Sequence, residues 1–296
     1  MKPSVFDYYA PDSLDEALAL LAQYGSDVKP LAGGQSLVPA MNFRVLHSAA
    51  LVDLNRLTVL EHIRQFDGEL RIGSMTRQRR IERDPLVAQF APLLHETMPY
   101  IAHPQIRNRG TLGGSLVHAD PAAELPVIAV ALNARLRVQS VKGERWLTAN
   151  DFFLGMFTTA LQPDELLVEI AFPPLPMEAG WSFMEFARRH GDYALIGVAA
   201  WITLDDRGVC RDARLVYLNA GNGPIDARSA AQLLRGREIS DEAIEASSAA
   251  ADREIEPTGN VHCSPAYQRH LARVLTRRAV WQAVERAKAQ HPVMNH

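Results

Sequence analysis

Two short segments of the sequence carry a glycine pair followed by a hydroxyl residue. They are Leu31-Ala32-Gly33-Gly34-Gln35-Ser36 and Gly110-Thr111-Leu112-Gly113-Gly114-Ser115. Paired glycines let backbone N–H groups approach an anion without a Cβ in the way. A hydroxyl at a helix start adds a further donor. We therefore expect the two loops to hold a diphosphate between them.

The same segments disfavour two other phosphate-binding classes. Neither contains the G-x-G-x-x-G pattern of a Rossmann dinucleotide site, and neither contains the G-x-x-x-x-G-K-[ST] pattern of a P-loop. A single glycine pair is most often a plain tight turn, so the prediction depends on the matched pair.

Composition limits the classes of protein further. The 296 residues suggest about two domains, and 47% hydrophobic with 22% charged residues is typical of a globular protein. A net charge of −3 supplies no basic field for nucleic acid. No signal peptide or membrane-length apolar run is visible, so we expect a cytoplasmic protein. The two cysteines, Cys210 and Cys263, cannot ligate a four-cysteine iron–sulfur cluster and are expected to be free thiols.

The elements around the loops predict an α+β fold. Ser13 and Glu16 form a capping box that opens a helix ended by Gly25. Short strands at 28–32 and 51–54 complete a small α/β unit over residues 1–55. The proline-rich segment 173–176 is the clearest linker. Beyond it, the pattern predicts long strands at 194–204 and 210–218, then helices at about 227–234, 241–251 and 264–289.

Five passages together resemble a known family. They are Lys29–Leu37 (KPLAGGQSL), Leu51–Arg56 (LVDLNR), His103–Ser115 (HPQIRNRGTLGGS), His118–Pro126 (HADPAAELP) and Arg188–Val198 (RRHGDYALIGV). The chain resembles the FAD-binding medium subunit of molybdenum hydroxylases, the group that includes carbon monoxide dehydrogenase, xanthine dehydrogenase and bacterial N-heterocycle hydroxylases. The likeness runs from near residue 1 to the C-terminal helix.

The resemblance implies a fold and its division into domains. It implies a FAD-binding domain of the vanillyl-alcohol-oxidase type at 1–176, with subdomains at about 1–55 and 56–176. A C-terminal flavoprotein domain follows at 177–296, in which a small antiparallel sheet packs on helices.

The resemblance also implies the residues that contact FAD. The first loop would hold the diphosphate with Lys29 nearby, Glu124 would contact ribityl or ribose hydroxyls, and Tyr193 would lie beside the isoalloxazine ring. The full set is Lys29, Leu31, Ala32, Gly33, Gly34, Gln35, Ser36, Leu37, Ile101, Ala102, Gly110, Thr111, Gly113, Gly114, Ser115, Asp120, Glu124, Leu167 and Tyr193. No acid–base catalytic residue and no metal ligand is expected in this chain.

The cofactors and partners implied are those of a relay subunit. FAD would be bound non-covalently, while molybdopterin and iron–sulfur clusters would lie on a large and a small partner subunit. The assembly would be a dimer of heterotrimers that passes electrons through this FAD to an external acceptor. Some relatives carry a lysine in the segment matching Phe183–Phe186, where this chain has no basic residue.

Other interpretations remain open at this stage. The chain could be a stand-alone FAD oxidoreductase of the same fold, which would turn over a substrate by itself. It could also be a non-redox binding or assembly protein, which would be colourless and bind no added FAD.

Several residues also have purely structural interpretations. Arg107 and Arg109 could form salt bridges that shape the loop, and Asp53 could cap a turn or pair with Arg56. Asp120 or Glu124 could cap the following helix.

Overall fold

The computed structural model describes residues 2–290 and divides them into two compact units. Unit 1 holds the residues up to Val87, together with His103–Ala119 and Ala134–Pro173. Unit 2 holds Ala88–Ala102, Asp120–Asn133 and the described residues from Pro174 onward. Each unit is described by itself.

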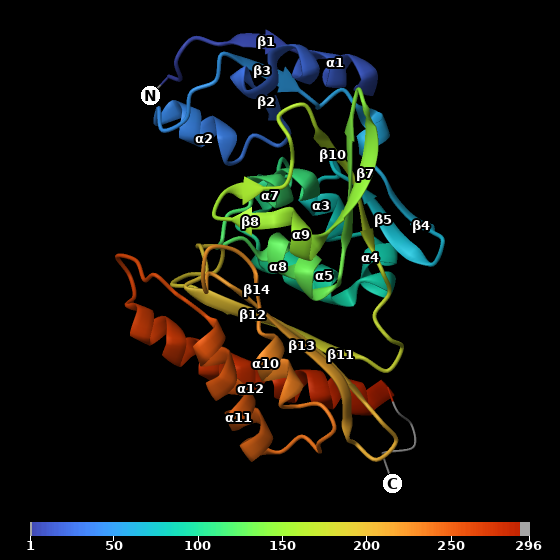
Figure 1. Ribbon diagram of the computed structural model, residues 1–296, viewed down its shortest axis with the longest axis vertical. Helices are drawn as coiled ribbons and strands as arrows, with labels where there is room; N and C mark the ends of the chain where they lie inside the picture. Colours follow the sequence, from blue (N-terminus) through green and yellow to red (C-terminus); the bar gives the residue numbers. More distant parts are fainter. Residues whose placement is uncertain (1, 291–296) are drawn as a thin grey trace. The chain divides into compact units, whose positions relative to one another are not determined.

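Unit 1 begins with a small parallel sheet of order β1-β3-β2 (Figure 1). Its elements are β1 (Asp7–Tyr9), α1 (Leu14–Tyr24), η1 (Gly25–Asp27), β2 (Val28–Leu31), α2 (Leu37–Asn42) and β3 (Ala50–Asp53). The predicted cap is present, because the Ser13 hydroxyl accepts from the Glu16 N–H at 3.2 Å. The Glu16 carboxylate in turn accepts from Asp12 N–H, one residue earlier than a regular capping box requires.

The rest of unit 1 is built on an antiparallel sheet of order β4-β5-β10-β6-β7. Its strands are β4 (Ile63–Phe66), β5 (Glu69–Gly73), β6 (Arg135–Ser140), β7 (Gly143–Thr148) and β10 (Leu166–Phe172). Around it lie η2 (Thr58–Leu60), α3 (Gln78–Ile81), α6 (Pro104–Arg107), α7 (Leu112–His118), α9 (Ala149–Phe152), β8 (Phe153–Gly155) and β9 (Thr158–Thr159). Leu166 and Val168 of β10 share one hydrophobic core with α1 and β3, so both sheets belong to a single packed body.

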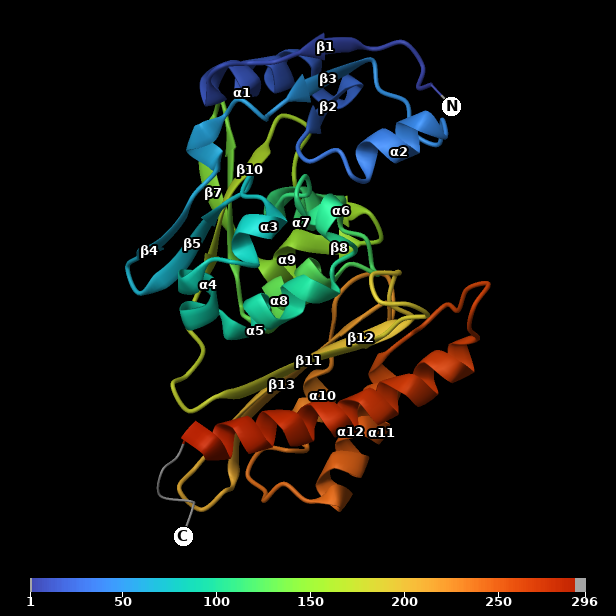
Figure 2. The same cartoon turned by 180° about the vertical axis from the view of Figure 1, so that it is seen from behind.

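Unit 2 is a four-stranded antiparallel sheet of order β11-β12-β13-β14 with helices on both faces (Figures 1 and 2). Its strands are β11 (Gly180–Phe186), β12 (Ile196–Leu204), β13 (Cys210–Leu218) and β14 (Ile225–Asp226). Its helices are α5 (Pro92–Thr97), η3 (Met98–Tyr100), α8 (Glu124–Ala131), α10 (Arg228–Gln232), α11 (Asp241–Glu254) and α12 (Pro265–Gln290), and α4 (Pro85–Phe90) spans the boundary between the units in sequence. The long strands and helices predicted from the sequence are confirmed.

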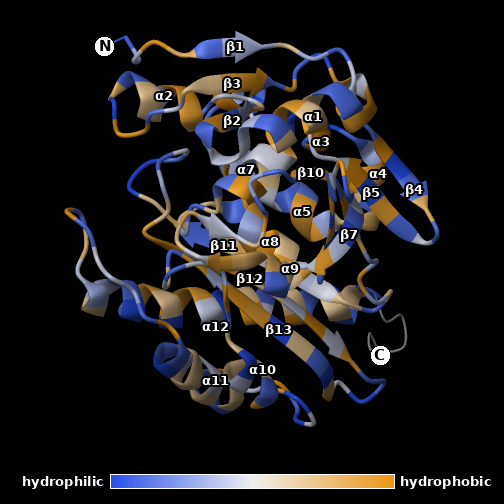
Figure 3. Cartoon of the chain, turned by 45° about the horizontal axis from the view of Figure 1, so that its top comes forward, coloured by the Kyte–Doolittle hydropathy of each residue, from blue (hydrophilic) through white to orange (hydrophobic). Residues whose placement is uncertain are grey.

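Hydrogen bonds identify which helix covers which face of this sheet. On one face, the buried Tyr217 hydroxyl bonds the Thr276 hydroxyl of α12 at 2.5 Å. On the other face, the Trp201 indole N–H donates to the Ala131 carbonyl of α8 at 2.8 Å. The inner strand β12 is buried along its whole length and is mostly hydrophobic in Figure 3, because both of its faces are covered.

Cys210 and Cys263 are buried free thiols, as expected. Within residues 2–290, no helix is both long and apolar enough to cross a membrane.

Candidate cofactor site

The first glycine loop connects the end of β2 to the start of α2. Gly34 adopts φ +72°, a left-handed conformation that favours glycine. The Gln35 side chain donates back to the Gly33 carbonyl at 2.9 Å and fixes the turn. Among residues 2–290, the backbone N–H groups of Gly33, Gly34, Gln35 and Ser36 donate to no protein acceptor. Four neighbouring amides are therefore available for an anion.

The second glycine loop has a different structure from the one that the sequence suggested. Thr111 is the N-cap of α7, and its hydroxyl accepts from Gly114 N–H at 3.0 Å. Leu112 N–H donates to the Thr76 carbonyl and Gly113 N–H to the Ser74 carbonyl, at 3.0 and 2.8 Å. These amides are therefore satisfied by the protein itself. The Ser115 hydroxyl has no hydrogen-bond partner in the described part of the chain and remains able to donate.

The two loops lie against one another, and glycine is what permits the contact. A Cβ on Gly33 would lie 2.3 Å from the Arg109 carbonyl oxygen and 2.8 Å from Gly110 Cα. A Cβ on Gly114 would lie 3.5 Å from Ala32 Cβ. The second loop is thus the surface on which the first loop rests.

A pocket of about 390 Å³ opens on the first loop. It is lined by Leu31, Ala32, Gly33, Gly34, Gln35, Val38, Pro39, Asp53, Asn55 and Arg109. Arg109 is exposed, and among the described residues its guanidinium pairs with no carboxylate. Burial and the positive charge of Arg109 lower the pKa of the neighbouring Arg77. The pocket therefore combines free amides with the positive charge of Arg109, while Asp53 adds a carboxylate to the same lining.

Polar bonds behind the pocket hold its wall in place. Asn55 donates to the Ala32 carbonyl at 3.1 Å, and Arg77 donates to the Asn55 side chain and to the Arg109 carbonyl. Asp53 accepts from Asn55 N–H at 2.9 Å, which confirms the turn-capping interpretation. Arg56 pairs with Asp12 rather than with Asp53.

Three further predicted contacts in unit 1 lie outside the pocket lining. Lys29 is exposed on β2, and Leu37 is partly exposed at the first position of α2. Leu167 is buried in β10, where it alternates with the core residues Leu166 and Val168 and so faces the opposite side of the sheet.

The remaining predicted contacts belong to unit 2. Ile101 is buried and Ala102 adopts φ 43°. The Asp120 carboxylate accepts from Ala122 N–H at 2.9 Å and so caps the turn before α8. Glu124 is the first residue of α8 and only 8% exposed. Tyr193 is 72% exposed.

The acidic residues of unit 2 influence one another. Burial, with a further contribution from the Asp120 charge, raises the pKa of Glu124 to about 7. Desolvation of its hydroxyl and the charges of Asp120 and Glu124 raise the pKa of Tyr193, although the residue as a whole is mostly exposed. The structure therefore brings Asp120, Glu124 and Tyr193 into one electrostatic group.

Arg107, by contrast, has the structural role that the sequence left open. Its guanidinium is buried and bonds the Glu82 carboxylate at 2.9 and 3.1 Å, which fixes the segment before the second loop. Five residues of the pocket lining are absent from the predicted set, namely Val38, Pro39, Asp53, Asn55 and Arg109. The spacing of Arg107 and Arg109, which are separated by one residue, could have suggested that the two side chains point in different directions.

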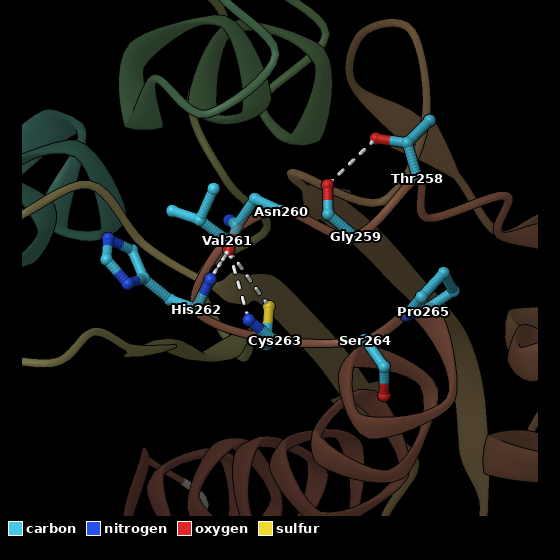
Figure 4. Close-up of a pocket in the computed structure, with 8 residues that line it drawn as sticks. All are labelled: Thr258, Gly259, Asn260, Val261, His262, Cys263, Ser264 and Pro265. Atoms are coloured by element: carbon cyan, nitrogen blue, oxygen red, sulfur yellow. Dashed lines mark hydrogen bonds between the residues drawn. The ribbon is translucent and has the colours of Figure 1, made fainter.

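A second hollow, of about 550 Å³, is formed by the single segment Thr258–Pro265 of unit 2 (Figure 4). The Asn260 side chain accepts from the N–H groups of His262 and Cys263 at 2.8 and 3.1 Å and curls the loop. It is larger than the pocket at the glycine loop, but its lining of described residues contains no carboxylate, lysine or arginine. Among residues 2–290, no three His, Cys, Asp or Glu side chains gather as a metal site.

The donors present fit a diphosphate-containing cofactor. A diphosphate requires several N–H donors and positive charge, and the pocket supplies four free amides beside Arg109. A Cβ on Gly34 would lie 3.2 and 3.3 Å from the pocket-lining side chains of Val38 and Leu31, so glycine at this position leaves room for an anion to approach the backbone. The loop is therefore a candidate site for the diphosphate of a dinucleotide cofactor.

Comparison with known proteins identifies the family. Residues 4–175 match the model of the FAD binding domain in molybdopterin dehydrogenase, and residues 181–283 match the CO dehydrogenase flavoprotein C-terminal domain. The chain therefore belongs to the FAD-binding medium subunits of the molybdenum hydroxylase family, as the sequence motifs indicated.

Individual relatives match over their whole length. The chain is 43% identical over 296 residues to the alpha subunit of the 6-hydroxypseudooxynicotine dehydrogenase complex of Paenarthrobacter nicotinovorans, covering 100% of both chains. It is 42% identical to the caffeine dehydrogenase subunit beta of Pseudomonas sp. (strain CBB1), covering 97% of each. The solved carbon monoxide dehydrogenase from Hydrogenophaga pseudoflava superimposes with a TM-score of 0.94 at 36% identity, covering 97% of this chain and 99% of that one.

Proposed function

We propose that this chain binds one non-covalent FAD through the first glycine loop. The observation that carries the proposal is the row of four amides at Gly33–Ser36, which have no protein acceptor among residues 2–290, next to the guanidinium of Arg109. These groups would hold the diphosphate, and the second loop would hold the first loop in place. The Ser115 hydroxyl would add a donor from the second loop. Lys29, Leu37, Leu167, Ile101, Ala102, Asp120, Glu124 and Tyr193 stay predicted contacts of the same cofactor.

We further propose that the chain works as the electron-transfer subunit of a heterotrimer. Bound FAD accepts electrons singly or in pairs and releases them singly or in pairs. The residues of this chain bind and orient it, and substrate oxidation takes place on a molybdopterin-containing large subunit. An iron–sulfur small subunit supplies the electrons, and an external acceptor removes them.

Three finer statements belong to the same proposal. The assembly is a dimer of heterotrimers, it works in the cytoplasm, and the chain divides functionally at 1–176 and 177–296. The alignment of the two family models with residues 4–175 and 181–283 supports that division. The full-length likeness to subunits of dehydrogenase complexes supports the heterotrimer.

FAD titration of the purified full-length chain tests the binding proposal. After removal of any bound flavin, FAD fluorescence should be quenched with a stoichiometry of one per chain, and ADP should compete because it carries the same diphosphate. Failure to bind FAD would support the non-redox alternative. Turnover of an oxidisable substrate by the isolated chain would support the stand-alone oxidoreductase.

A further inference from the structure

Two largely desolvated carboxyl side chains of unit 2, those of Glu124 and Glu185, form no ion pair among residues 2–290. Glu124 is the first residue of α8 and is 8% exposed. Glu185 lies on β11, and its Oε2 is buried with no partner. Burial of an unpaired carboxylate costs free energy. A carboxyl group found in this situation in a folded protein is therefore expected to be protonated, to contact a ligand, or both.

The strand register explains how these two residues come to share one region. Glu185 pairs with Gly197 of β12, and Gly197 pairs with Leu218 of β13, so the three residues form one row across the sheet. The next residue, Asn219, donates its N–H to the Pro121 carbonyl at 2.7 Å. This bond holds the turn before α8 at the end of the row, which places Glu124 near Glu185.

Glycine at the centre of the row makes room for the second carboxyl. A Cβ on Gly197 would lie 2.9 Å from the Glu185 Cβ, so a larger residue would displace the Glu185 side chain. The helix α8 packs on β12 and β13, on the face of the sheet that carries Trp201. The arrangement is therefore fixed by backbone packing and does not depend on a flexible loop.

Among residues 2–290, no cationic side chain contributes to the pKa shift of Glu124. Asp120 and the Tyr193 hydroxyl are its titratable neighbours, and Asp120 is acidic. Burial and the Asp120 charge raise the pKa of Glu124 to about 7. Burial and the Glu124 charge raise the pKa of Glu185 to about 8.

In the described part of the chain, no cationic side chain contributes to the pKa shift of Glu185 either. Tyr100 is its neighbour from η3, and desolvation with the charges of Glu96 and Glu185 raises the pKa of Tyr100. Arg286 is committed to Glu96, which it bonds at 2.5 Å, and His190 stacks on the Tyr100 ring at 6.3 Å. At neutral pH, one proton on the pair is therefore favoured over two full charges.

We propose that Glu185 joins Glu124 in a two-carboxyl site for neighbouring hydroxyl groups of the flavin cofactor, with Glu185 as hydrogen-bond donor. A protonated carboxyl can donate to one hydroxyl oxygen, while the charged carboxylate accepts from the adjacent hydroxyl. A pair of full carboxylates could only accept. This inference rests on the proposed FAD function and adds a residue and a protonation state to it.

FAD affinity of the full-length chain, measured by fluorescence quenching between about pH 6 and about pH 9, tests the inference. Because loss of the proton from Glu185 removes a donor and adds a second charge, affinity should fall roughly tenfold as pH rises past about 8. Glu185→Gln keeps a donor at every pH, so its affinity should not fall in this range. Glu124→Gln removes the neighbouring charge and should move the fall to lower pH.

The matched control is Glu245→Gln, which removes the same charge from an exposed position of α11 and should reproduce the unmodified chain. Circular dichroism verifies that each variant is folded. If a variant does not fold, the pH dependence of FAD affinity of the unmodified chain still tests the inference. An unmodified chain with equal affinity at about pH 7 and about pH 9 would overturn the inference, as would a Glu185→Gln variant with the original fall. No FAD binding at any pH would instead overturn the proposed function.

Two cofactor fragments distinguish the source of the hydroxyls. FMN carries the ribityl chain without the adenosine ribose, and ADP carries the ribose without the ribityl chain. If only FMN affinity falls with pH, the pair contacts the ribityl hydroxyls, and if only ADP affinity falls, it contacts the ribose. If the affinities for FMN and for ADP both stay constant with pH, the carboxyl pair contacts neither the ribityl nor the ribose hydroxyls.

Discussion

Replacement of Gly33 by alanine tests the contact between the two glycine loops. The added Cβ would lie 2.3 Å from the Arg109 carbonyl oxygen, whereas real Cβ atoms essentially never come within 3.0 Å of such an atom. The neighbour is backbone and cannot rotate away, so the loops must separate by about 0.7 Å, the difference between those two distances. The amides of the first loop would move with the backbone.

The expected size of the effect follows from the bonds that this movement weakens. A hydrogen bond to a charged group contributes about 1.5–3 kcal/mol, so weakening of one or two of them should raise the Kd for FAD by roughly 100-fold. Overpacking of this kind typically costs about 1–3 kcal/mol of unfolding free energy. Fluorescence quenching by the apoprotein gives the first quantity, and urea unfolding gives the second.

Gly155→Ala provides a matched control in the same unit. No heavy atom lies within 4 Å of a Cβ built on Gly155, and its φ is not in the left-handed region. FAD affinity and stability should therefore stay close to those of the unmodified chain. If Gly33→Ala bound FAD within about threefold of the unmodified chain, the loop could not be the diphosphate cradle and the reasoning would be refuted.

Three further variants test separate parts of the account. Burial alone would raise the pKa of Glu169, but hydrogen bonds from His62 and Arg64 outweigh it and lower the pKa to about 2. Glu169→Gln should therefore cost about 3 kcal/mol in urea unfolding above pH 4.5, and the difference should shrink as pH falls toward about 2; an equal cost at both ends would contradict the ion-pair explanation. Thr111→Val removes the acceptor for Gly114 N–H, so thermal unfolding should show a loss of about 1 kcal/mol, with FAD affinity several-fold weaker because the supporting loop loosens. Tyr217→Phe removes a buried hydroxyl bonded to Thr276 and should cost about 1 kcal/mol while FAD affinity is unchanged; a large change in affinity would be unexpected, because no predicted cofactor contact touches it.

Local sequence signals were sufficient to predict much of the fold. The capping serine at Ser13, the alternating and continuous apolar runs of β12 and β13, and the proline-rich segment at 173–176 all act through neighbours in sequence. Such features depend on short-range sterics and burial, which a sequence displays directly.

Features that depend on distant partners were not visible in the sequence. The amides of the second loop are satisfied by the carbonyls of Ser74 and Thr76, which no local pattern connects to residues 112 and 113. Arg107 and Arg109 are the same residue type, yet only the fold pairs the first with Glu82 and leaves the second at the pocket. The matching motifs suggested two equivalent loops, whereas the structure gives one a set of free amides and the other a supporting position.

The same limit applies to Glu185. On sequence alone it is one acidic residue in an otherwise apolar and aromatic strand, at a place where the family resemblance only marks a missing lysine. Its neighbours are Gly197 across the sheet and Glu124 at the start of α8, and both contacts depend on strand register and helix packing. A buried carboxyl without a partner is recognised only when the surrounding atoms are placed.

Native mass spectrometry of the complex isolated through this chain tests the central claim most directly. The account predicts an assembly that contains this chain, a small subunit and a large subunit, and a mass increment of one FAD on this chain that is lost on denaturation. A chain that carries no FAD, or one that keeps the flavin covalently after denaturation, would contradict it.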